Sequence, residues 1–121
     1  MREFDLIARY FSRPVPEGFL GAGDDCAVLP LVPGRQCVVS TDSLIEGRHF
    51  LSEVDPFSLG HKSLAVNVSD LAAMGATPAG CVLSLALPHV DESWLSEFSD
   101  GFYRLANEFD CPLIGGDTTG T

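Results

Sequence analysis

Residues 79–114, AGCVLSLALPHVDESWLSEFSDGFYRLANEFDCPLI, contain the pattern that decides the fold. The apolar run over 79–87 predicts a strand, which Pro88 ends. Asp91 then stands where a helix cap is expected. The apolar residues that follow it have the spacing of one helix face: Leu95, Phe98, Phe102, Leu105 and Phe109. A further strand begins at Pro112, so we expect a helix that packs against a sheet.

The segments before residue 79 extend the same plan. Residues 2–11 carry a short helical stripe, and residues 56–75 have helical spacing. Residues 26–31 and 37–45 are predicted strands, and the turn-like sequence at 32–35 between them suggests an antiparallel pair. We therefore expect an α/β or α+β domain, with a four-stranded mixed sheet that helices cover on one face.

The charge of the chain excludes several classes of protein. At 121 residues it is long enough for one domain, and its 17 acidic residues against 7 basic ones give a net charge of −10. A nucleic-acid interface needs clustered cationic side chains, and the single lysine, Lys62, and scattered arginines do not supply them. No apolar stretch approaches the roughly 20 residues that span a bilayer. We expect a cytoplasmic chain that binds neither nucleic acid nor membrane.

The four cysteines do not have the spacing of a metal site. Cys26, Cys37, Cys81 and Cys111 are far apart, and each lies in or beside an apolar run. Zinc ligands are usually closer together, and a disulfide scaffold is typical of smaller secreted chains. We predict four reduced thiols in the core.

Carboxylates stand beside glycines, hydroxyls or an amide in four places. These are GDD at 23–25, STDS at 40–43, NVSD at 67–70 and GGDTT at 115–119. The second and fourth groups directly follow short apolar runs, CVV at 37–39 and PLI at 112–114, which are typical of buried strands. Their acids should therefore lie at strand ends, where open sheets bind ligands. Converging carboxylates repel one another and need cations, and oxygen donors favour Mg²⁺ or Ca²⁺ over zinc. Glycine backbone can approach phosphate oxygens closely. Together the groups predict a metal-phosphate site.

Each group also has a simpler explanation. GDD alone is often a turn, STDS a strand end with local hydrogen bonds, and GGD an exit from a strand. Asn67 and Asp70 could belong to a buried polar network that fixes the helix. The combination, in a chain with so few bases, favours the metal site. We therefore expect the short polar stripe of Ser63, Asn67 and Asp70 to face a ligand.

Other catalytic motifs are missing from the sequence. No P-loop pattern and no Gly-x-Ser-x-Gly elbow occurs, and no cysteine and histidine have the pairing of a nucleophile with its base. The histidines do not have metal-ligand spacing. Only His49, near the STDS group and next to Arg48, is a candidate contact, and a surface or hydrogen-bonding role is the alternative.

Four motifs, in order, closely resemble the N-terminal half of the thiamine-monophosphate kinase family. They are GDDCAVL (23–29), STDSLIEGRHF (40–50), KSLAVNVSDLAAMGATP (62–78) and LIGGDTT (113–119). The resemblance covers nearly the whole chain. It implies the N-terminal domain, residues 1–121, of an aminoimidazole ribonucleotide synthetase-like protein. In that superfamily two four-stranded sheets join into a β-barrel in the dimer.

The resemblance implies transfer of the γ-phosphoryl group of ATP to thiamine monophosphate, with several Mg²⁺ ions between the two anionic reactants. By motif position the Mg²⁺ ligands are Asp25, Ser40, Thr41, Asp42, Asp70 and Asp117. Among these, Asp42, Asp70 and Asp117 are the implied catalytic residues. Gly116 and Asp117 resemble part of the ATP-phosphate site, and His49 a substrate contact. Tyr103 is an implied nucleotide contact or, equally, a half-buried core aromatic.

The family's second domain is missing from the resemblance, and the chain stops directly after the last motif. We expect the chain alone to fold, to form a homodimer, and to bind Mg²⁺ and nucleotide weakly with little turnover. Selenophosphate synthetase and the hydrogenase-maturation dehydratase are alternatives within the superfamily. The first would need a reactive cysteine in residues 12–23, where there is none. A non-catalytic, metal-stabilised dimerisation module is the alternative from another class.

Overall fold

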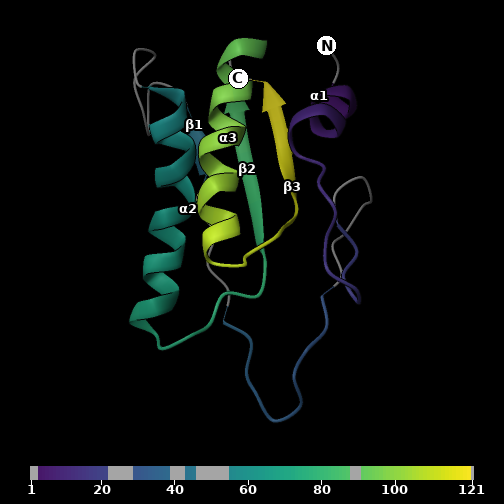
Figure 1. Cartoon of the computed structure of the whole chain (residues 1–121), viewed down its shortest axis with the longest axis vertical. Helices are drawn as coiled ribbons and strands as arrows, with labels where there is room; N and C mark the ends of the chain where they lie inside the picture. The colour runs from purple at the N-terminus through teal and green to yellow at the C-terminus, as the bar shows by residue number, and fades with distance from the viewer. Residues whose placement is uncertain (1–2, 22–28, 39–42, 46–54, 88–90, 121) are drawn as a thin grey trace.

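The computed structural model describes residues 3–21, 29–38, 43–45, 55–87 and 91–120, with 3–4, 43–45 and 117–120 described as backbone only. Its elements follow in the order α1 (Glu3–Tyr10), β1 (Ser43–Ile45), α2 (Pro56–Ala73), β2 (Cys81–Leu87), α3 (Glu92–Glu108) and β3 (Leu113–Gly120). Helices α2 and α3 lie side by side over the sheet, and α1 lies next to β3 (Figure 1). The predicted α/β class is confirmed, with all three predicted helices.

The sheet that the described residues form has three strands in the order β1-β2-β3, and both pairs are parallel. The antiparallel pair predicted from residues 26–31 and 37–45 was wrong within the described residues, because 29–31 and 37–38 form no strand there. The end of the second predicted strand is confirmed, since residues 43–45 form β1, which pairs in parallel with β2. The turn between the two predicted segments is present: Gly34 has φ 80°, and the Arg35 N–H donates to the Val32 carbonyl at 3.2 Å. Pro30 lacks the N–H that a strand ladder needs, which disfavours pairing at the end of the first predicted strand.

Helix α3 begins and ends where its sequence signals lie. The Asp91 carboxylate accepts a hydrogen bond from the Trp94 N–H at 3.1 Å, as its N-cap position predicts. After the helix, Asp110 has φ 51°, and the Cys111 N–H donates to the Ala106 carbonyl at 2.8 Å. The chain thereby turns into β3, which completes a parallel strand-helix-strand unit.

Helix α2 is capped in the same way. Asp55 accepts from both the N–H and the hydroxyl of Ser58, at 3.1 and 2.6 Å, and Pro56 occupies the first turn. At the other end Gly75 adopts φ 69°, and the Ala76 N–H donates to the Leu71 carbonyl at 2.9 Å. This left-handed glycine ends the helix and directs the chain toward β2.

The core lies between α3 and the sheet. Leu83 and Leu85 of β2 are buried on the face that the helices cover, and Leu95 and Phe98 of α3 are fully buried. The Trp94 ring stacks on Phe98 with centroids 5.1 Å apart. The apolar stripe predicted for α3 is thus confirmed over its first four positions. The fifth, Phe109, is the C-cap residue and is 44% exposed.

Two glycines allow α2 and α3 to pack with their backbones in contact. A Cβ atom added to Gly60 would overlap the Phe98 carbonyl, and one added to Gly101 would overlap the Phe57 carbonyl. Because both obstacles are backbone, no side-chain rotation can relieve the overlap. These glycines fix how α2 lies on α3.

The cysteine prediction is confirmed in part. Cys81 and Cys111 are free thiols in or next to the core, and the Cys81 thiol donates to the Pro112 carbonyl at 3.5 Å. Hydrogen bonding with Cys111, together with burial, raises the pKa of Cys81. Cys37 is also free but exposed, so its predicted core position was wrong, because residues 29–38 do not join the sheet. Cys26 lies outside the described residues.

None of the helices that the structure describes combines the length and the hydrophobicity needed to cross a membrane.

Candidate functional site

The predicted site falls partly on described residues. Those that lie outside them are Asp25, Ser40, Thr41, Asp42 and His49. The structure places Asp70 on α2, Tyr103 on α3, and Gly116 and Asp117 on β3. For these four residues the structure gives the element on which each lies, and the expectation was that the site residues come together in space.

The GGDTT motif lies inside β3 rather than after it. The strand runs from Leu113 to Gly120, so Asp117 lies within the strand rather than at its expected end, and the alternative of a plain exit from the strand at GGD was wrong as well. Asp117 is paired in register with Ser84 of β2, and Ser84 is paired with Ser43 of β1. The sheet thus brings part of the STDS group and part of the GGDTT group into one row across three strands.

Gly116 has a structural role within this sheet. Its φ is 138°, and an added Cβ atom would overlap the backbone of Leu83, its partner on β2. Any side chain here would separate β2 from β3. The glycine is therefore required by strand pairing, whether or not a phosphate group also approaches it.

The side chains of the polar stripe of α2 differ in their burial and hydrogen bonding. The Ser63 hydroxyl donates to the Gly60 carbonyl at 2.8 Å, and the Asn67 amide donates to the Ser63 carbonyl at 3.4 Å. Both side chains are half-buried, whereas Asp70 is exposed. Among the described residues no group of three or more histidine, cysteine, aspartate or glutamate side chains is placed to hold a metal ion. The expected metal cluster is not assembled by these residues alone.

Tyr103 is more buried than the half-buried aromatic considered as its alternative role. Its side chain is part of the hydrophobic core, and its hydroxyl has no hydrogen-bond partner among the described residues. Burial raises the pKa of Tyr103 to about 12, and the positive charge of Arg13 opposes that shift. The Arg13 guanidinium lies 3.7 Å from the ring centroid. Contact of Tyr103 with a nucleotide remains a prediction.

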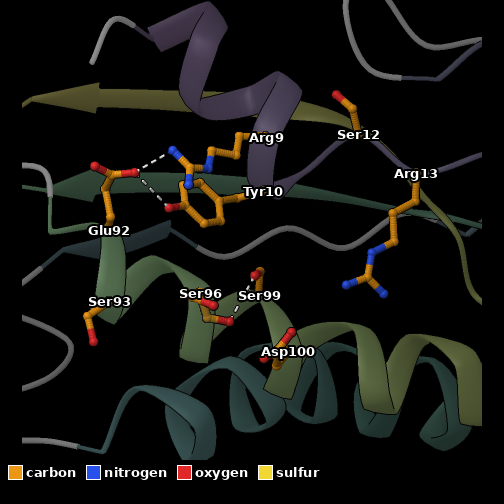
Figure 2. Close-up of a pocket in the computed structure, with 9 residues that line it drawn as sticks. All are labelled: Arg9, Tyr10, Ser12, Arg13, Glu92, Ser93, Ser96, Ser99 and Asp100. Carbon is orange, nitrogen blue, oxygen red and sulfur yellow. Dashed lines mark hydrogen bonds and ion pairs between the residues drawn. The ribbon is translucent and has the colours of Figure 1, made fainter.

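A groove between α1 and α3 was missed by the sequence analysis (Figure 2). It has a volume of about 470 Å³ and is open to solvent. It is lined by Arg9, Tyr10, Ser12, Arg13, Glu92, Ser93, Ser96, Ser99 and Asp100. The available signal was a set of serines three positions apart on α3, at 93, 96 and 99. Those serines share a helix face that carries hydroxyls where a surface helix usually carries charges.

The two ends of the groove differ in how their charges are paired. Arg9 forms an ion pair with Glu92 at 2.6 Å, and the Tyr10 hydroxyl donates to the same carboxylate at 3.2 Å. Arg13, at the other end, has no carboxylate partner among the residues that the structure describes. Ser99 lies between the two ends and is 4% exposed (Figure 2).

Comparison with known proteins gives the class of the chain. Residues 23–121 match the family described as AIR synthase related protein, N-terminal domain. Because this match covers most of the chain, the chain belongs to that family.

The individual relatives it matches are thiamine-monophosphate kinases. The chain is 54% identical to the *Escherichia coli* (strain K12) protein over 120 residues, which is 97% of this chain and 37% of the relative. It is 40% identical to the *Bacillus subtilis* (strain 168) protein over 125 residues, 100% of this chain and 38% of the relative. The crystal structure of the kinase from *Stenotrophomonas maltophilia* K279a has a TM-score of 0.77 and 48% identity, and the match covers 97% of this chain and 36% of that one. The resemblance predicted from the motifs is confirmed, and the chain spans a little over a third of these relatives.

Proposed function

We propose that this chain is the N-terminal ATP- and Mg²⁺-binding domain of a cytoplasmic thiamine-monophosphate kinase. The reaction would transfer the γ-phosphoryl group of ATP to the phosphate of thiamine monophosphate and form thiamine diphosphate. The observation that carries the proposal is the 54% identity to the *Escherichia coli* kinase over 97% of the chain. The four ordered motifs support it, because their carboxylates and hydroxyls are the donors that Mg²⁺ prefers.

The residues fit a magnesium-phosphate site by their chemistry. The sheet register brings Ser43 and Asp117 to neighbouring positions of Ser84, so oxygen donors from two motifs share one row. Gly116, beside Asp117, presents backbone without a side chain. The residues that would hold the metal are Asp25, Ser40, Thr41, Asp42, Asp70 and Asp117. When bound, Mg²⁺ would neutralise phosphate charge and help align the two reactants.

The protein's own part in this reaction would be to position charged groups. Asp42, Asp70 and Asp117 would hold the metal-phosphate assembly, and Gly116 would contact the ATP phosphates through its backbone. His49 would contact thiamine monophosphate, and Tyr103 the nucleotide. A phosphate nucleophile is already ionised at neutral pH, so no side chain need act as a general base.

We extend the proposal to a homodimer built on the open face of the sheet. Val82 of β2 is 47% exposed on the face opposite Leu83 and Leu85. A parallel sheet usually has both faces covered, and the described helices cover only one. A second copy on the open face, with a fourth strand in each sheet, would complete the barrel that the resemblance implies.

Catalysis would depend on more than these residues. The chain spans 37% of the *Escherichia coli* relative, so the remaining part of such a kinase would supply further contacts. We propose that the 121 residues alone bind Mg²⁺ and nucleotide weakly and show little turnover.

The test is a product assay with Mg²⁺, ATP and thiamine monophosphate, in which ADP and thiamine diphosphate are separated by chromatography. We expect both products in equal amounts from the intact protein, and loss of both in Asp42→Asn, because the amide cannot neutralise a metal ion. Asp110→Asn is the matched control. Asp110 is exposed and has φ 51°, which asparagine tolerates well, so that variant should keep full activity.

Other outcomes of the product assay would favour a different function. ADP without thiamine diphosphate would indicate a superfamily relative with a different acceptor. If neither product formed, and Mg²⁺ alone raised the melting temperature with no further effect of an ATP analogue, the non-catalytic dimerisation module would be favoured. Full turnover by the 121 residues alone would contradict the proposed dependence on a second domain.

A further inference from the structure

Two thiols of the chain are neighbours where β2 and β3 begin. Cys81 is the first residue of β2, and Cys111 comes two residues before Leu113, the partner of Cys81 on β3. The Cys81 N–H donates to the Pro112 carbonyl at 2.8 Å, so the backbone joins the two segments at this point. The Cys81 sulfur lies 3.7 Å from the Cys111 carbonyl oxygen, and its thiol also hydrogen-bonds with the Cys111 thiol. The fold therefore already holds the two sulfurs side by side.

The strand pairing around these thiols is irregular. Cys81 pairs with Leu113 but Val82 pairs with Gly115, so the register skips Ile114. Such an irregularity locally disrupts the ladder, and the backbone there can shift without breaking a regular row of hydrogen bonds. A disulfide needs its sulfurs about 2 Å apart, closer than two hydrogen-bonded thiols. The irregular start of the two strands is a place where that small approach can be made.

The two thiols differ in reactivity and in access. The hydrogen bond from Cys81 lowers the pKa of Cys111, while burial and the negative charge of Asp110 oppose that shift. Because the thiolate is the form that reacts with oxidants, Cys111 is the sulfur expected to react first. Cys111 is 2% exposed, whereas Cys81 is half-buried. Only a small oxidant that can pass Cys81 would therefore reach Cys111.

We propose that Cys81 and Cys111 are a modification site, at which hydrogen peroxide converts the two thiols into a reversible disulfide within the native fold. The Cys111 thiolate attacks one peroxide oxygen, the O–O bond breaks, and Cys111 becomes a sulfenic acid. The departing hydroxide takes up the proton that the Cys111 thiol had released and leaves as water. The Cys81 sulfur then attacks the sulfenic sulfur, the S–O bond breaks, and hydroxide leaves as water with the proton of the Cys81 thiol. Two thiols have then lost two electrons and two protons, and one peroxide has become two waters.

The bond would close a loop that contains the whole of α3. Cys81 and Cys111 are 30 positions apart, and α3 lies between them. A cross-link of this kind stabilises a protein mainly by restricting its unfolded chain, so the oxidised protein should melt several degrees above the reduced one. Disulfides of cytoplasmic proteins are typically transient, so a thiol reductant should reverse this one. The inference does not depend on the proposed kinase activity, because neither ATP nor thiamine monophosphate takes part in it.

The test is peptide mapping of the intact, folded protein after treatment with hydrogen peroxide, with the remaining thiols blocked before digestion. We expect a cross-linked pair of peptides that contain Cys81 and Cys111, lighter by two hydrogen atoms than the two free peptides together. Dithiothreitol should abolish it. Cys81→Ser should remove both the cross-link and the rise in melting temperature. Cys37→Ser is the matched control: it removes an exposed thiol and should leave both unchanged.

Mapping of the unsubstituted protein decides the question even where a cysteine variant fails to fold. The proposal is overturned if the Cys81–Cys111 pair does not form at peroxide concentrations that oxidise the exposed Cys37. It is also overturned if the pair forms only after the protein has been unfolded in urea. A melting temperature that falls as the pair forms would overturn it too, because the bond would then distort the native packing.

Discussion

The two faces of β2 are built for different purposes. On the helix-covered face, Leu83 and Leu85 are 9% and 1% exposed and pack against α3. On the opposite face Val82 is 47% exposed, and Ser84 stands in one row with Ser43 and Asp117. The covered face explains why the chain folds as it does. The residues of the open face do not pack against any of the described helices. Ligand binding and association with another chain therefore explain their residue types better than packing does.

The largest loss of stability should come from a substitution that disrupts the contact between α2 and α3, on the helix-covered side of the sheet. Gly101→Ala would place a Cβ atom against the Phe57 carbonyl, and the two helices would have to separate. We expect a loss of about 3 kcal/mol or more in the free energy of unfolding, measured by urea denaturation. Gly75→Ala is the control: nothing lies within 4 Å of its Cβ position, and only its φ of 69° is strained. It should lose about 1 kcal/mol, and equal losses would show that the helix contact does not matter.

A substitution on each face of the same strand sharpens the comparison further. Leu85→Ala should cost about 3 kcal/mol, because the side chain is almost fully buried. Val82→Ala should cost less than about 1 kcal/mol if the open face is exposed to water. Val82→Asp then tests the proposed dimer by sedimentation over a range of protein concentrations.

We expect the unsubstituted protein to associate and Val82→Asp to remain monomeric, because a buried carboxylate is strongly disfavoured. An Asp variant that associates as well as the unsubstituted protein would rule out this face as the dimer interface. A monomeric unsubstituted protein at all concentrations would rule out the dimer itself.

The smallest effect concerns the end of α2 rather than its buried face. The hydroxyl and N–H of Ser58 lower the pKa of Asp55. A lowered pKa stabilises the folded state above the unfolded value of about 3.9, and the contribution disappears as the pH falls through the folded value. Unfolding measured against pH should therefore show an advantage over Asp55→Asn at neutral pH that declines below about pH 4. A difference that stays constant down to pH 2 would contradict this origin.

The helices that cover the sheet were predicted well from the sequence, because helix periodicity and N-caps depend on residues that are close together in the chain. Helix α3 was identified from its stripe and from Asp91, and both are confirmed. Residues 29–31 and 37–38 were mistaken for parts of two strands, because apolar composition alone does not reveal whether a partner strand is present. The GGDTT motif showed the opposite error. Its glycines and hydroxyls suggested a loop, yet parallel pairing with β2 holds it as a strand.

Only the part of the candidate site that lies in the four sequence motifs could be predicted. The carboxylates could be named from four short segments, and the sheet register brings two of those segments together through Ser43 and Asp117. The groove between α1 and α3 could not be predicted, because it depends on tertiary contacts. Arg9 and Glu92 are 83 positions apart, and no periodicity relates them.

The contact between α2 and α3 also determines how Asp70 is supported. The buried residues of α2, Leu59, Gly60 and Leu64, all lie in its first half. Beyond them Ala65 and Val68 still pack against the core, so contact with the rest of the domain reaches to within two residues of Asp70. In mechanical terms α2 is a beam that is clamped at Gly60 and supported a second time at Val68. The position of Asp70 is therefore set by both supports, and a rotation at Gly60 would be resisted at Val68 before it reached the carboxylate.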